Sequence, residues 1–494
     1  MGVEGTSKTG GDGRGRILIR GARVVTLDAN GTEHETADIL IEDGRIAAVG
    51  AVDHAAAATC DRTIDGSGRL ALPGLVNAHT HSPLSVVHGV YDRLNHRASM
   101  WLFQAYTANR TPREVYVSAM LNCMEMLLSG TTSALDHFPE QSFSAEDVEA
   151  VVAAYRDSGM RVQVALRIFD GEYTDIMPPG GSLPPHLQDA VSRNNPFKPR
   201  SVPELRELCS DAISRWNGDS GRIGIGPAPS NPMRCSDELL EMCVEISDAT
   251  GVGVHCHLLE TAVQAEIAQR RYGTTMVRHL DDIGLLTSRL SCAHTIWIGD
   301  EDIELMAERG AIVVHNPESN IRSGSGIAPI PRMLARGVRV GLGNDGSCSG
   351  GDQVLQRAMR LATMIHRVQE PDPAKWIGNG DAMRMATAGG AAAMQAEDVI
   401  GAIEAGRKAD IVLYDLDRPW WTPVNDPVHQ FVQSENGSGV DTVIVDGRVL
   451  VDGGKIVAFD ADAILAEARE LVPAMKDRNR TLFDLVEEVG RAVI

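Results

Sequence analysis

The sequence predicts an α/β fold: a (β/α)8 TIM barrel with a small composite β-sandwich domain built from both chain ends. Three observations carry this prediction. Between residues 74 and 345, eight short apolar runs alternate with amphipathic stretches of helical period. Strand-like runs joined by turns precede this region and return after it. Polar residues gather at the C-terminal ends of many apolar runs, as they do at the mouth of a barrel.

The two ends of the chain carry the same β-rich pattern. Residues 17–50 contain two alternating runs joined by a hairpin turn at 42–45. Further runs lie at 410–415 and 442–452, and the second of these turns at Asp446. Neither half has enough strands to be stable alone, and two separate appendages would each leave an unpaired edge. We therefore expect one sandwich made from both halves.

The alternating region is expected to supply the barrel. Its strands are predicted at 74–79, 131–136, 161–166, 222–227, 252–257, 290–294, 311–315 and 338–345. Helices are predicted between them, for example at 112–128, 145–157, 202–216, 237–249, 300–309 and 353–365. Several of these helices are followed by glycine, the residue most common just past a helix C-terminus. A doubly wound open sheet is the alternative, but it would spread the strand-end polar residues along a line.

These patterns divide the chain into five segments. They are a disordered tail at 1–16, the N-terminal half of the β-sandwich at 17–75, a metal-dependent hydrolase barrel at 76–400, the C-terminal half of the β-sandwich at 401–460, and C-terminal helices at 461–494. The tail is predicted because it is rich in glycine and polar residues. The last segment contains two amphipathic stretches, at 462–472 and 482–493, which we expect to pack on the outside.

Composition excludes several classes of function. The formal net charge of −21 argues against nucleic acid or an anionic membrane as a partner. No segment reaches the length of a transmembrane helix, and the start lacks the apolar core of a signal peptide. The eight cysteines include no CxxC pair and suggest no disulfide framework, which predicts reduced thiols and a cytoplasmic location.

The strand ends carry an unusual set of histidines. His79 and His81 end an apolar run one residue apart, so both side chains point to the same side of a strand. Neutral imidazole is a good ligand for zinc or ferrous iron. In a barrel all strand ends converge on one mouth. The strand-end candidates are His79, His81, His255, His257, His294 and Asp345.

This set predicts a catalytic metal. Three histidines and one aspartate leave one coordination position open for water, whereas a structural metal is usually fully enclosed by protein ligands. The metal lowers the pKa of that water, so hydroxide exists near neutral pH and a nearby carboxylate can accept the released proton.

Four motifs in this order resemble the amidohydrolase superfamily. They are Leu72-Pro-Gly-Leu-Val-Asn-Ala-His79-Thr-His81, His257-Leu-Leu-Glu-Thr, Ala293-His294 and Gly343-Asn-Asp345-Gly. The segment 315–330 is similar to the branch that holds adenosylhomocysteine/methylthioadenosine deaminases, guanine deaminases and s-triazine hydrolases (chlorohydrolases). The resemblance covers residues 17–460. It implies the predicted barrel and sandwich, one divalent metal, and hydrolytic removal of an amino or other leaving group from an N-heteroaromatic ring.

The resemblance also implies roles for individual residues. The implied metal ligands are His79, His81, His257 and Asp345. Asp345 would also accept a proton from the bound water, Glu260 would carry that proton to a ring nitrogen, and His294 would orient the water. The competing interpretations are a helix-capping carboxylate for Glu260 and a core histidine for His294.

Other residues near the expected mouth keep two interpretations. We interpret His255 as packing or as support for the metal ligands. His137 could reach the substrate or lie on the surface. Arg167 could anchor a substrate carboxylate or carbonyl, or form a surface salt bridge. Trp101 is a further candidate for substrate binding.

The sequence departs from the family pattern at several positions. The fourth predicted strand and the residues after it, Ile223 to Ser230, carry no lysine that could be carboxylated as in binuclear members, which favours one metal and deaminase-like chemistry. Ala228 and Met100 stand where adenosylhomocysteine deaminases carry a ribose-holding histidine and glutamate, which argues against ribose recognition of that kind. The Pro-Ala-Pro around Ala228 looks like the triazine hydrolases instead. The loop 347–352 replaces a more usual Ser-Asn pair at the pocket.

The sequence therefore predicts a hydrolase of C–N bonds in cyclic amidines. We expect a mononuclear zinc enzyme, with ferrous iron as the alternative, that removes an amino group from a purine, pterin, pyrimidine or s-triazine. One alternative is release of chloride or an alkylamine from a triazine at the same site. Another is an inactive barrel scaffold, which should have lost ligands. From the resemblance, the expected partners are a small N-heterocyclic substrate and further copies of the chain, in a dimer or tetramer.

Overall fold

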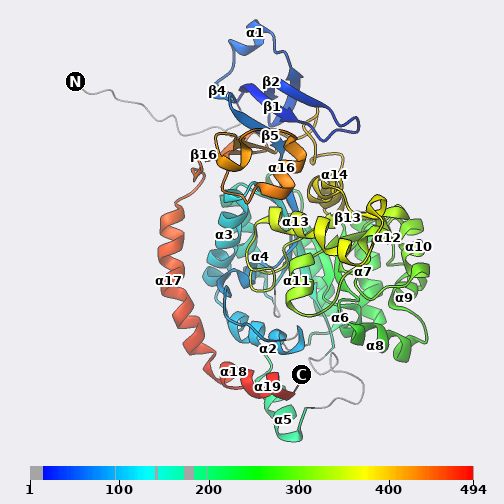
Figure 1. The fold of residues 1–494 in the computed structure, drawn as a ribbon. Coiled ribbons are helices and arrows are strands. Elements are labelled where there is room, and N and C mark those ends of the chain that lie inside the picture. Colours follow the sequence, from blue (N-terminus) through cyan, green and yellow to red (C-terminus); the bar gives the residue numbers. More distant parts are fainter. Residues whose placement is uncertain (1–14, 95, 140–142, 172–182, 197–198, 493–494) are drawn as a thin grey trace.

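A computed structural model describes residues 15–94, 96–139, 143–171, 183–196 and 199–492 (Figure 1). The predicted disordered tail lies outside these ranges except for residues 15 and 16. Within them, no helix is both long enough and apolar enough to cross a membrane. All eight cysteines are free thiols.

The central strands form two parallel sheets, each with its strands in sequence order. The first sheet contains β6 (Leu75–Thr80), β7 (Thr131–Phe138), β8 (Arg161–Ile168) and β9 (Ile223–Pro229). The second contains β10 (Val254–Leu258), β11 (Leu290–His294), β12 (Ile312–His315) and β13 (Arg339–Leu342). Each of the eight predicted runs overlaps one of these strands.

Backbone hydrogen bonds join the two sheets at both seams. At one seam, His257 N donates to Ser230 O at 3.2 Å. At the other, Asp345 N donates to His79 O at 2.9 Å, beside a parallel bridge between Thr80 and Asp345. Strand order and parallel pairing are those of a TIM-barrel fold, and both seam contacts lie at the C-terminal ends of the strands.

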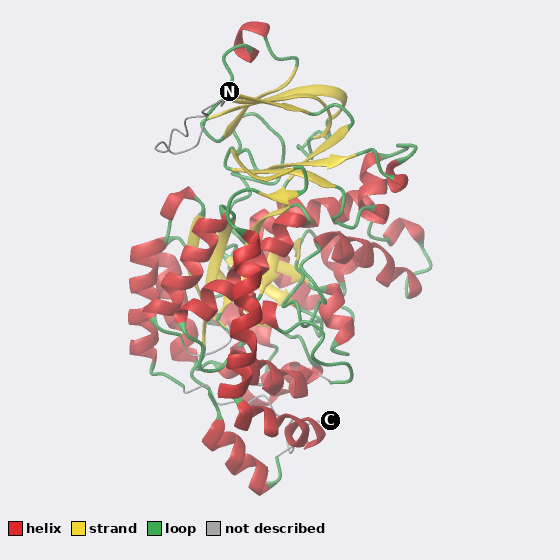
Figure 2. Ribbon diagram, turned by 90° about the vertical axis from the view of Figure 1, so that its left-hand side faces the viewer, coloured by secondary structure: helices red, strands yellow, loops and turns green. Residues whose placement is uncertain are grey.

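Helices surround these sheets on the outside (Figures 1 and 2). They are α3 (Pro112–Leu128), α4 (Ala145–Ser158), α6 (Val202–Trp216), α7 (Asp237–Thr250), α8 (Ala262–Tyr272), α9 (Met276–Asp282), α10 (Asp300–Arg309), α11 (Pro317–Arg322), α12 (Ile330–Ala335), α13 (Leu355–Ile365) and α14 (Asn379–Arg384). Helix α5 (Pro185–Asn194) lies below the sheets in Figure 1. Helix α15 (Gly390–Ala393) packs in one apolar cluster with Val76 of β6 and Val314 of β12. At the start of α3, Thr111 and Glu114 form a capping box, each side chain accepting from the other's backbone N–H. Gly159 and Gly251 end α4 and α7 with φ of 80° and 75°, a backbone conformation that glycine adopts without strain.

Strands from both chain ends share one nine-stranded sheet. The N-terminal side supplies β1 (Ile17–Val25), β2 (Glu33–Glu42), β3 (Arg45–Gly50), β4 (Arg62–Asp65) and β5 (Arg69–Pro73). The C-terminal side supplies β14 (Ile411–Asp415), β15 (Val440–Val445), β16 (Arg448–Asp452) and β17 (Lys455–Ile456). The halves meet where β5 pairs antiparallel with β14. Buried isoleucines from both halves, including Ile39 and Ile411, pack in one apolar cluster.

Buried ion pairs hold this sheet to the N-terminal ends of the barrel strands, which we call the base. Arg161, at the start of β8, donates from Nε and Nη2 to Asp410 at 2.9 and 3.2 Å. Asp446 accepts from Lys408 Nζ at 2.5 Å and lies 3.8 Å from Arg222. The nine-stranded sheet therefore lies at the opposite end from the mouth.

The C-terminal helices run along the outside of the barrel (Figure 1). They are α17 (Ala461–Arg478), α18 (Arg480–Asp484) and α19 (Val486–Ala492), while α16 (Pro427–Ser434) precedes them near the sheet. Helix α17 continues through Pro473, past the predicted end at 472. Trp101, on α2 (His96–Thr107), donates from Nε1 to Leu482 O at 3.1 Å. The C-terminal helices thus support α2.

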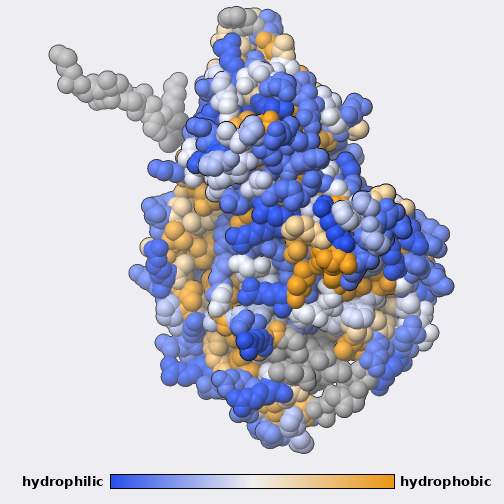
Figure 3. All heavy atoms as spheres, viewed as in Figure 1, coloured by the Kyte–Doolittle hydropathy of each residue, from blue (hydrophilic) through white to orange (hydrophobic). Residues whose placement is uncertain are grey.

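The face drawn in Figure 3 is largely hydrophilic, with separate apolar patches. Among the described residues, the large apolar side chains that are exposed are Leu128, Trp297, Ile321, Met364, Val368 and Val457.

Candidate metal and active site

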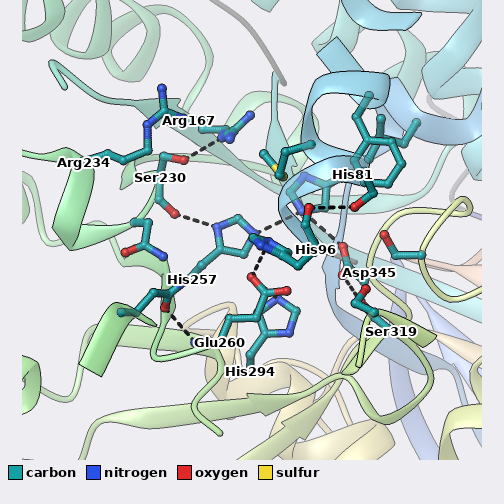
Figure 4. A pocket seen from close by; sticks show the side chains of 18 of the residues that line it. His81, His96, Arg167, Ser230, Arg234, His257, Glu260, His294, Ser319 and Asp345 are labelled. Atoms are coloured by element: carbon teal, nitrogen blue, oxygen red, sulfur yellow. Dashed lines mark hydrogen bonds and ion pairs between the residues drawn. The ribbon is translucent and has the colours of Figure 1, made fainter. Parts of the chain in front are cut away.

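The mouth of the barrel brings the implied ligands together. His79 and His81 come from β6, His257 from β10, and Asp345 from the segment after β13. His81 Nε2 lies 3.3 Å from both His257 Nε2 and Asp345 Oδ1. His79 Nε2 lies 3.7 Å from the same Asp345 oxygen. Three ring nitrogens and a carboxylate oxygen therefore face one small space, some of whose residues Figure 4 shows.

Hydrogen bonds fix which nitrogens face that space. His81 Nδ1 donates to His137 O at 3.0 Å, and His257 Nδ1 donates to Ser230 O at 2.6 Å. Because a carbonyl can only accept, Nδ1 carries the proton in both rings and Nε2 presents a lone pair. His79 Nε2 is buried and has no hydrogen-bond partner in the stretches of chain that the structure describes. Three imidazole lone pairs and a carboxylate are the donor set of a catalytic zinc.

The same rings are kept neutral. Burial, and then the neighbouring His81, lower the pKa of His79 well below its ordinary value of 6.5. The same two causes, in the same order, lower the pKa of His257. A neutral imidazole is the form that binds a metal, so this electrostatic environment favours ligation.

Four residues at the mouth, including Asp345 and His294, adopt a strained backbone conformation. Leu259, His294, Thr295 and Asp345 adopt φ between 47° and 73°, in the left-handed region that costs non-glycine residues free energy. Such strain persists only where surrounding contacts hold it. For Asp345 those contacts are direct: Gly346 N donates to Oδ1 at 2.7 Å, and Ser319 Oγ donates to Oδ2 at 2.5 Å.

Glu260 lies beside the metal ligands and is buried. Its Oε2 is 3.0 Å from His96 Nε2 and 4.0 Å from His294 Nε2 (Figure 4). Burial by itself would raise the pKa of Glu260, but the charges of His294 and then His96 outweigh burial and hold the pKa well below its usual range. The carboxylate is therefore ionised and able to accept a proton. The Glu260 carboxylate faces His96 and His294, while the Glu260 backbone N–H donates to Gln264 Oε1 at 2.7 Å.

A hydrogen bond to Asn320 orients the His294 ring. Its Nδ1 donates to Asn320 Oδ1 at 2.7 Å, which leaves Nε2 directed towards Glu260. Its ring lies 5.5 Å from the His257 ring and nearly parallel to it. His294 thus faces the ligand cluster, whereas a packing histidine would face the apolar core.

A pocket opens over this cluster. Apolar side chains in its lining include Leu84, Met100, Phe103 and Met233. Two buried arginines also line it, Arg167 and Arg234, and Arg167 Nε donates to Ser230 Oγ at 2.8 Å. Arg167 therefore lies buried at the pocket, so the interpretation that places it at the surface is wrong.

Trp101 and His137 lie elsewhere than expected. Trp101 is fully buried against the C-terminal helices, and its neighbours Ser99 and Met100 line the pocket instead. His137 is also fully buried, so the surface interpretation is wrong for it too. Both of its ring nitrogens lack a hydrogen-bond partner among the described residues, and its ring centroid is 4.5 Å from that of His257. One ring nitrogen of His137 lies within 4.8 Å of ligand atoms of His79, His81 and His257.

Sequence reasoning missed three contacts. His96 belongs to no motif, and its partner Glu260 is far away in the sequence. Arg234 lies in a short turn after β9, and the sequence of this turn does not predict that the side chain lines the pocket. Ser319 lies within the family-like segment 315–330, which could have marked it as a neighbour of Asp345.

These features define a metal-dependent hydrolase with its site at the mouth of a TIM-barrel fold. The sequence model of the amidohydrolase family matches residues 70–450. The chain therefore belongs to the amidohydrolase family, and it is a hydrolase that acts on C–N bonds.

Curated relatives match nearly the whole chain. It is 33% identical to the 5'-deoxyadenosine deaminase of Methanosarcina mazei over 458 residues, which covers 92% of this chain and 97% of the relative. It is 35% identical to the 5-methylthioadenosine/S-adenosylhomocysteine deaminase of Symbiobacterium thermophilum over 462 residues, or 92% and 98% of the two chains.

Solved structures agree in fold. A zinc-bound adenosine deaminase from Xanthomonas campestris matches with a TM-score of 0.81 and 28% identity, covering 94% of this chain and 98% of the other. The zinc complex of atrazine chlorohydrolase from Arthrobacter aurescens TC1 matches with a TM-score of 0.82 and 29% identity, covering 92% and 100%. Zinc in both neighbours agrees with a divalent metal at the histidine cluster.

Proposed function

We propose that one Zn²⁺ is held by His79, His81, His257 and Asp345, and that the chain is an aminohydrolase of a small N-heterocyclic ring. The observation that carries this proposal is the position of Glu260. Beside four converging metal-ligating groups stands an ionised carboxylate that contacts two histidines and lines the pocket. Ring deamination needs such a group, because the ring nitrogen must gain a proton when water attacks the neighbouring carbon.

The residues divide the proton transfers between them. When bound, the metal supplies a nucleophilic water at neutral pH. The new C–O bond forms at the ring carbon and the C–N bond breaks. Glu260 takes one proton from the water to the ring nitrogen, and Asp345 takes the other to the departing amine, which leaves as ammonia. His294 orients the water, and His96 holds the Glu260 carboxylate.

The substrate class follows from the pocket and from the relatives. Phe103, Met100 and Met233 offer apolar surfaces that suit a flat ring, and Arg167 and Arg234 offer donors for ring oxygens or a carboxylate. The curated relatives named above are deaminases of adenosine derivatives. We propose a purine, pterin, pyrimidine or s-triazine as substrate, with purines first. Ala228 and Met100 replace the expected ribose-holding residues, so a free base is favoured over a nucleoside.

A second candidate reaction uses the same site. Triazine hydrolases share 29% identity with this chain over 93% of its length, with a TM-score of 0.84 in one variant. Release of chloride or an alkylamine from a triazine is therefore the alternative to deamination.

One screen separates these reactions. The zinc-loaded protein is incubated with purines, pterins, pyrimidines, chloro- and amino-triazines, and adenosyl compounds, and ammonia, chloride and alkylamine are measured in each reaction. The proposal expects ammonia from at least one ring substrate. Chloride or alkylamine without ammonia supports the alternative reaction, and no release from any compound contradicts both.

Three broader features belong to the same proposal. The nine-stranded sheet, from 17–75 and 401–460, is the composite sandwich that supports the barrel base at 76–400. Eight free thiols support a cytoplasmic location. Exposed Met364 and Val368, at and just after the end of α13, suit an interface in a homo-oligomer.

A further inference from the structure

A further buried histidine, His255, contacts the proposed metal ligand His79. His255 lies two residues before His257 on β10 and is 2% exposed. Its Nε2 is 2.8 Å from His79 Nδ1, and its Nδ1 is 2.7 Å from Ser291 Oγ on β11. His79, His255 and Ser291 therefore form a hydrogen-bonded chain that leads away from the metal position.

The direction of this chain determines which nitrogen of His79 carries a proton. Ser291 Oγ donates to Val254 O, at 3.4 Å, and so can accept from His255 Nδ1. His255 Nε2 is then the acceptor for His79 Nδ1–H. His79 Nε2, the buried atom without a partner among the described residues, is left with a lone pair directed at the ligand cluster.

The opposite direction is incompatible with a metal. If Ser291 donated to His255 Nδ1, His255 Nε2 would carry the proton and donate to His79 Nδ1. The proton of His79 would then lie on Nε2, facing the Asp345 carboxylate 3.7 Å away. Such a ring cannot ligate through Nε2.

The other two histidine ligands lack this freedom. His81 and His257 donate to the backbone carbonyls of His137 and Ser230, and a carbonyl never donates. Their tautomers are fixed by the fold alone. For His79 the acceptor is a side chain that can either donate or accept, so its tautomer depends on His255 and Ser291.

We propose that His255 is a positioning residue that selects the metal-binding tautomer of His79, with Ser291 setting the tautomer of His255. The inference rests on the proposed metal site. Tight packing alone does not account for the His255 ring, because a small cavity borders His255 and Ser291 together with Gln163 and Ala165. Groups that orient metal-bound histidines typically change metal affinity by about 10- to 100-fold when removed.

Two substitutions separate hydrogen bonding from packing. His255→Leu keeps a bulky side chain but removes the acceptor, whereas His255→Gln can still accept from His79 Nδ1 through its amide oxygen. Zinc affinity is measured by competition with dipicolinic acid, without substrate, and the visible absorption of the Co²⁺-loaded proteins reports ligand geometry. We expect His255→Leu to bind zinc about 10- to 100-fold more weakly, with altered Co²⁺ bands. His255→Gln should stay within about threefold of wild type and keep its bands.

His315→Leu is the matched control. His315 is another buried strand-end histidine, and its nearest ring contact is His366 at 5.8 Å. Zinc affinity should not change in this variant. Ser291→Ala gives a second route if His255→Leu does not fold, and it should weaken zinc binding in the same direction.

Three results would overturn the proposal. One is wild-type zinc affinity in His255→Leu or in folded Ser291→Ala. Another is an equal loss in His255→Gln and His255→Leu, which would show that ring shape matters and the acceptor does not. A wild-type protein that binds no zinc would overturn the metal site and this proposal together. Failure of the substrate screen with zinc binding intact would count against the proposed reaction alone.

Discussion

The two ends of the barrel each hold a buried polar cluster, and the clusters differ in how their members are satisfied. At the base, Arg161 and Asp410 pair through two hydrogen bonds, and Lys408 pairs with Asp446. At the mouth, His79, His81 and His257 direct lone pairs at one another and at the Asp345 carboxylate. The base joins donors to acceptors, whereas at the mouth three ring nitrogens and one Asp345 oxygen face one another as acceptors.

This difference separates a structural cluster from a ligand site. Opposite charges at the base satisfy each other within the chain, so the cluster needs nothing more. Four converging lone-pair donors at the mouth repel one another unless a cation lies between them. Positive φ does not make this division, because Asp446 at the base adopts φ of 50°, as Asp345 and His294 at the mouth adopt 62° and 73°. The chemical kind of a buried cluster, more than its degree of burial, therefore indicates function.

Removing Asp345 should have the largest effect at the mouth. Asp345→Ala deletes a proposed ligand and a proton acceptor, so turnover should fall by about 10⁴-fold, and bound metal should fall with it. Ammonia release and metal content after gel filtration measure the two losses. Asp211→Ala is the control, since that carboxylate lies on the outer helix α6, pairs with Arg215 at 2.8 Å and should leave both quantities near wild type. Retained turnover in Asp345→Ala would remove this residue from the mechanism.

The matching change at the base should affect stability alone. Asp410→Ala leaves the Arg161 guanidinium buried without its carboxylate partner, which costs about 3–5 kcal/mol of folding free energy. Urea unfolding measures the loss, and zinc content per folded molecule should stay constant. A large loss of metal at unchanged stability would contradict the division between the two ends.

Glu260 tests proton transfer separately from metal binding. Glu260→Gln keeps the size of the side chain but removes its ability to carry a proton, so turnover should fall by about 10²-fold or more with metal retained. Glu266→Gln, on the exposed face of α8, is the control and should be fully active. If Glu260→Gln is also fully active, another group carries the proton.

A partly exposed pair should have the smallest effect. His88 Nε2 lies 2.9 Å from Glu125, and this hydrogen bond raises the pKa of His88 above 6.5. The pair should therefore add stability below about pH 6.5, and this contribution is lost as pH rises through the folded-state pKa. His88 is 39% exposed, so the contribution should be about 0.5 kcal/mol or less. Unfolding of wild type and His88→Gln at pH 5.5 and 8.5 measures it, and a difference that grows with pH would contradict the assignment.

The sequence predicted what depends on local pattern. The eight barrel strands were expected because apolar runs alternate with amphipathic stretches, and each run overlaps a strand. His79 and His81 were expected to face one side because strand side chains alternate. The contact of His96 with Glu260 was not expected, because the two residues are far apart in the sequence and no sequence motif links them. Trp101 was misplaced for the same reason: its partner is the distant Leu482.

The most direct test is anomalous diffraction at the zinc edge from crystals of the zinc-loaded protein. The account predicts one strong peak at about 2.0–2.2 Å from Nε2 of His79, His81 and His257 and from a carboxylate oxygen of Asp345. A peak at another position, or no peak at the mouth of a fully loaded protein, would contradict it.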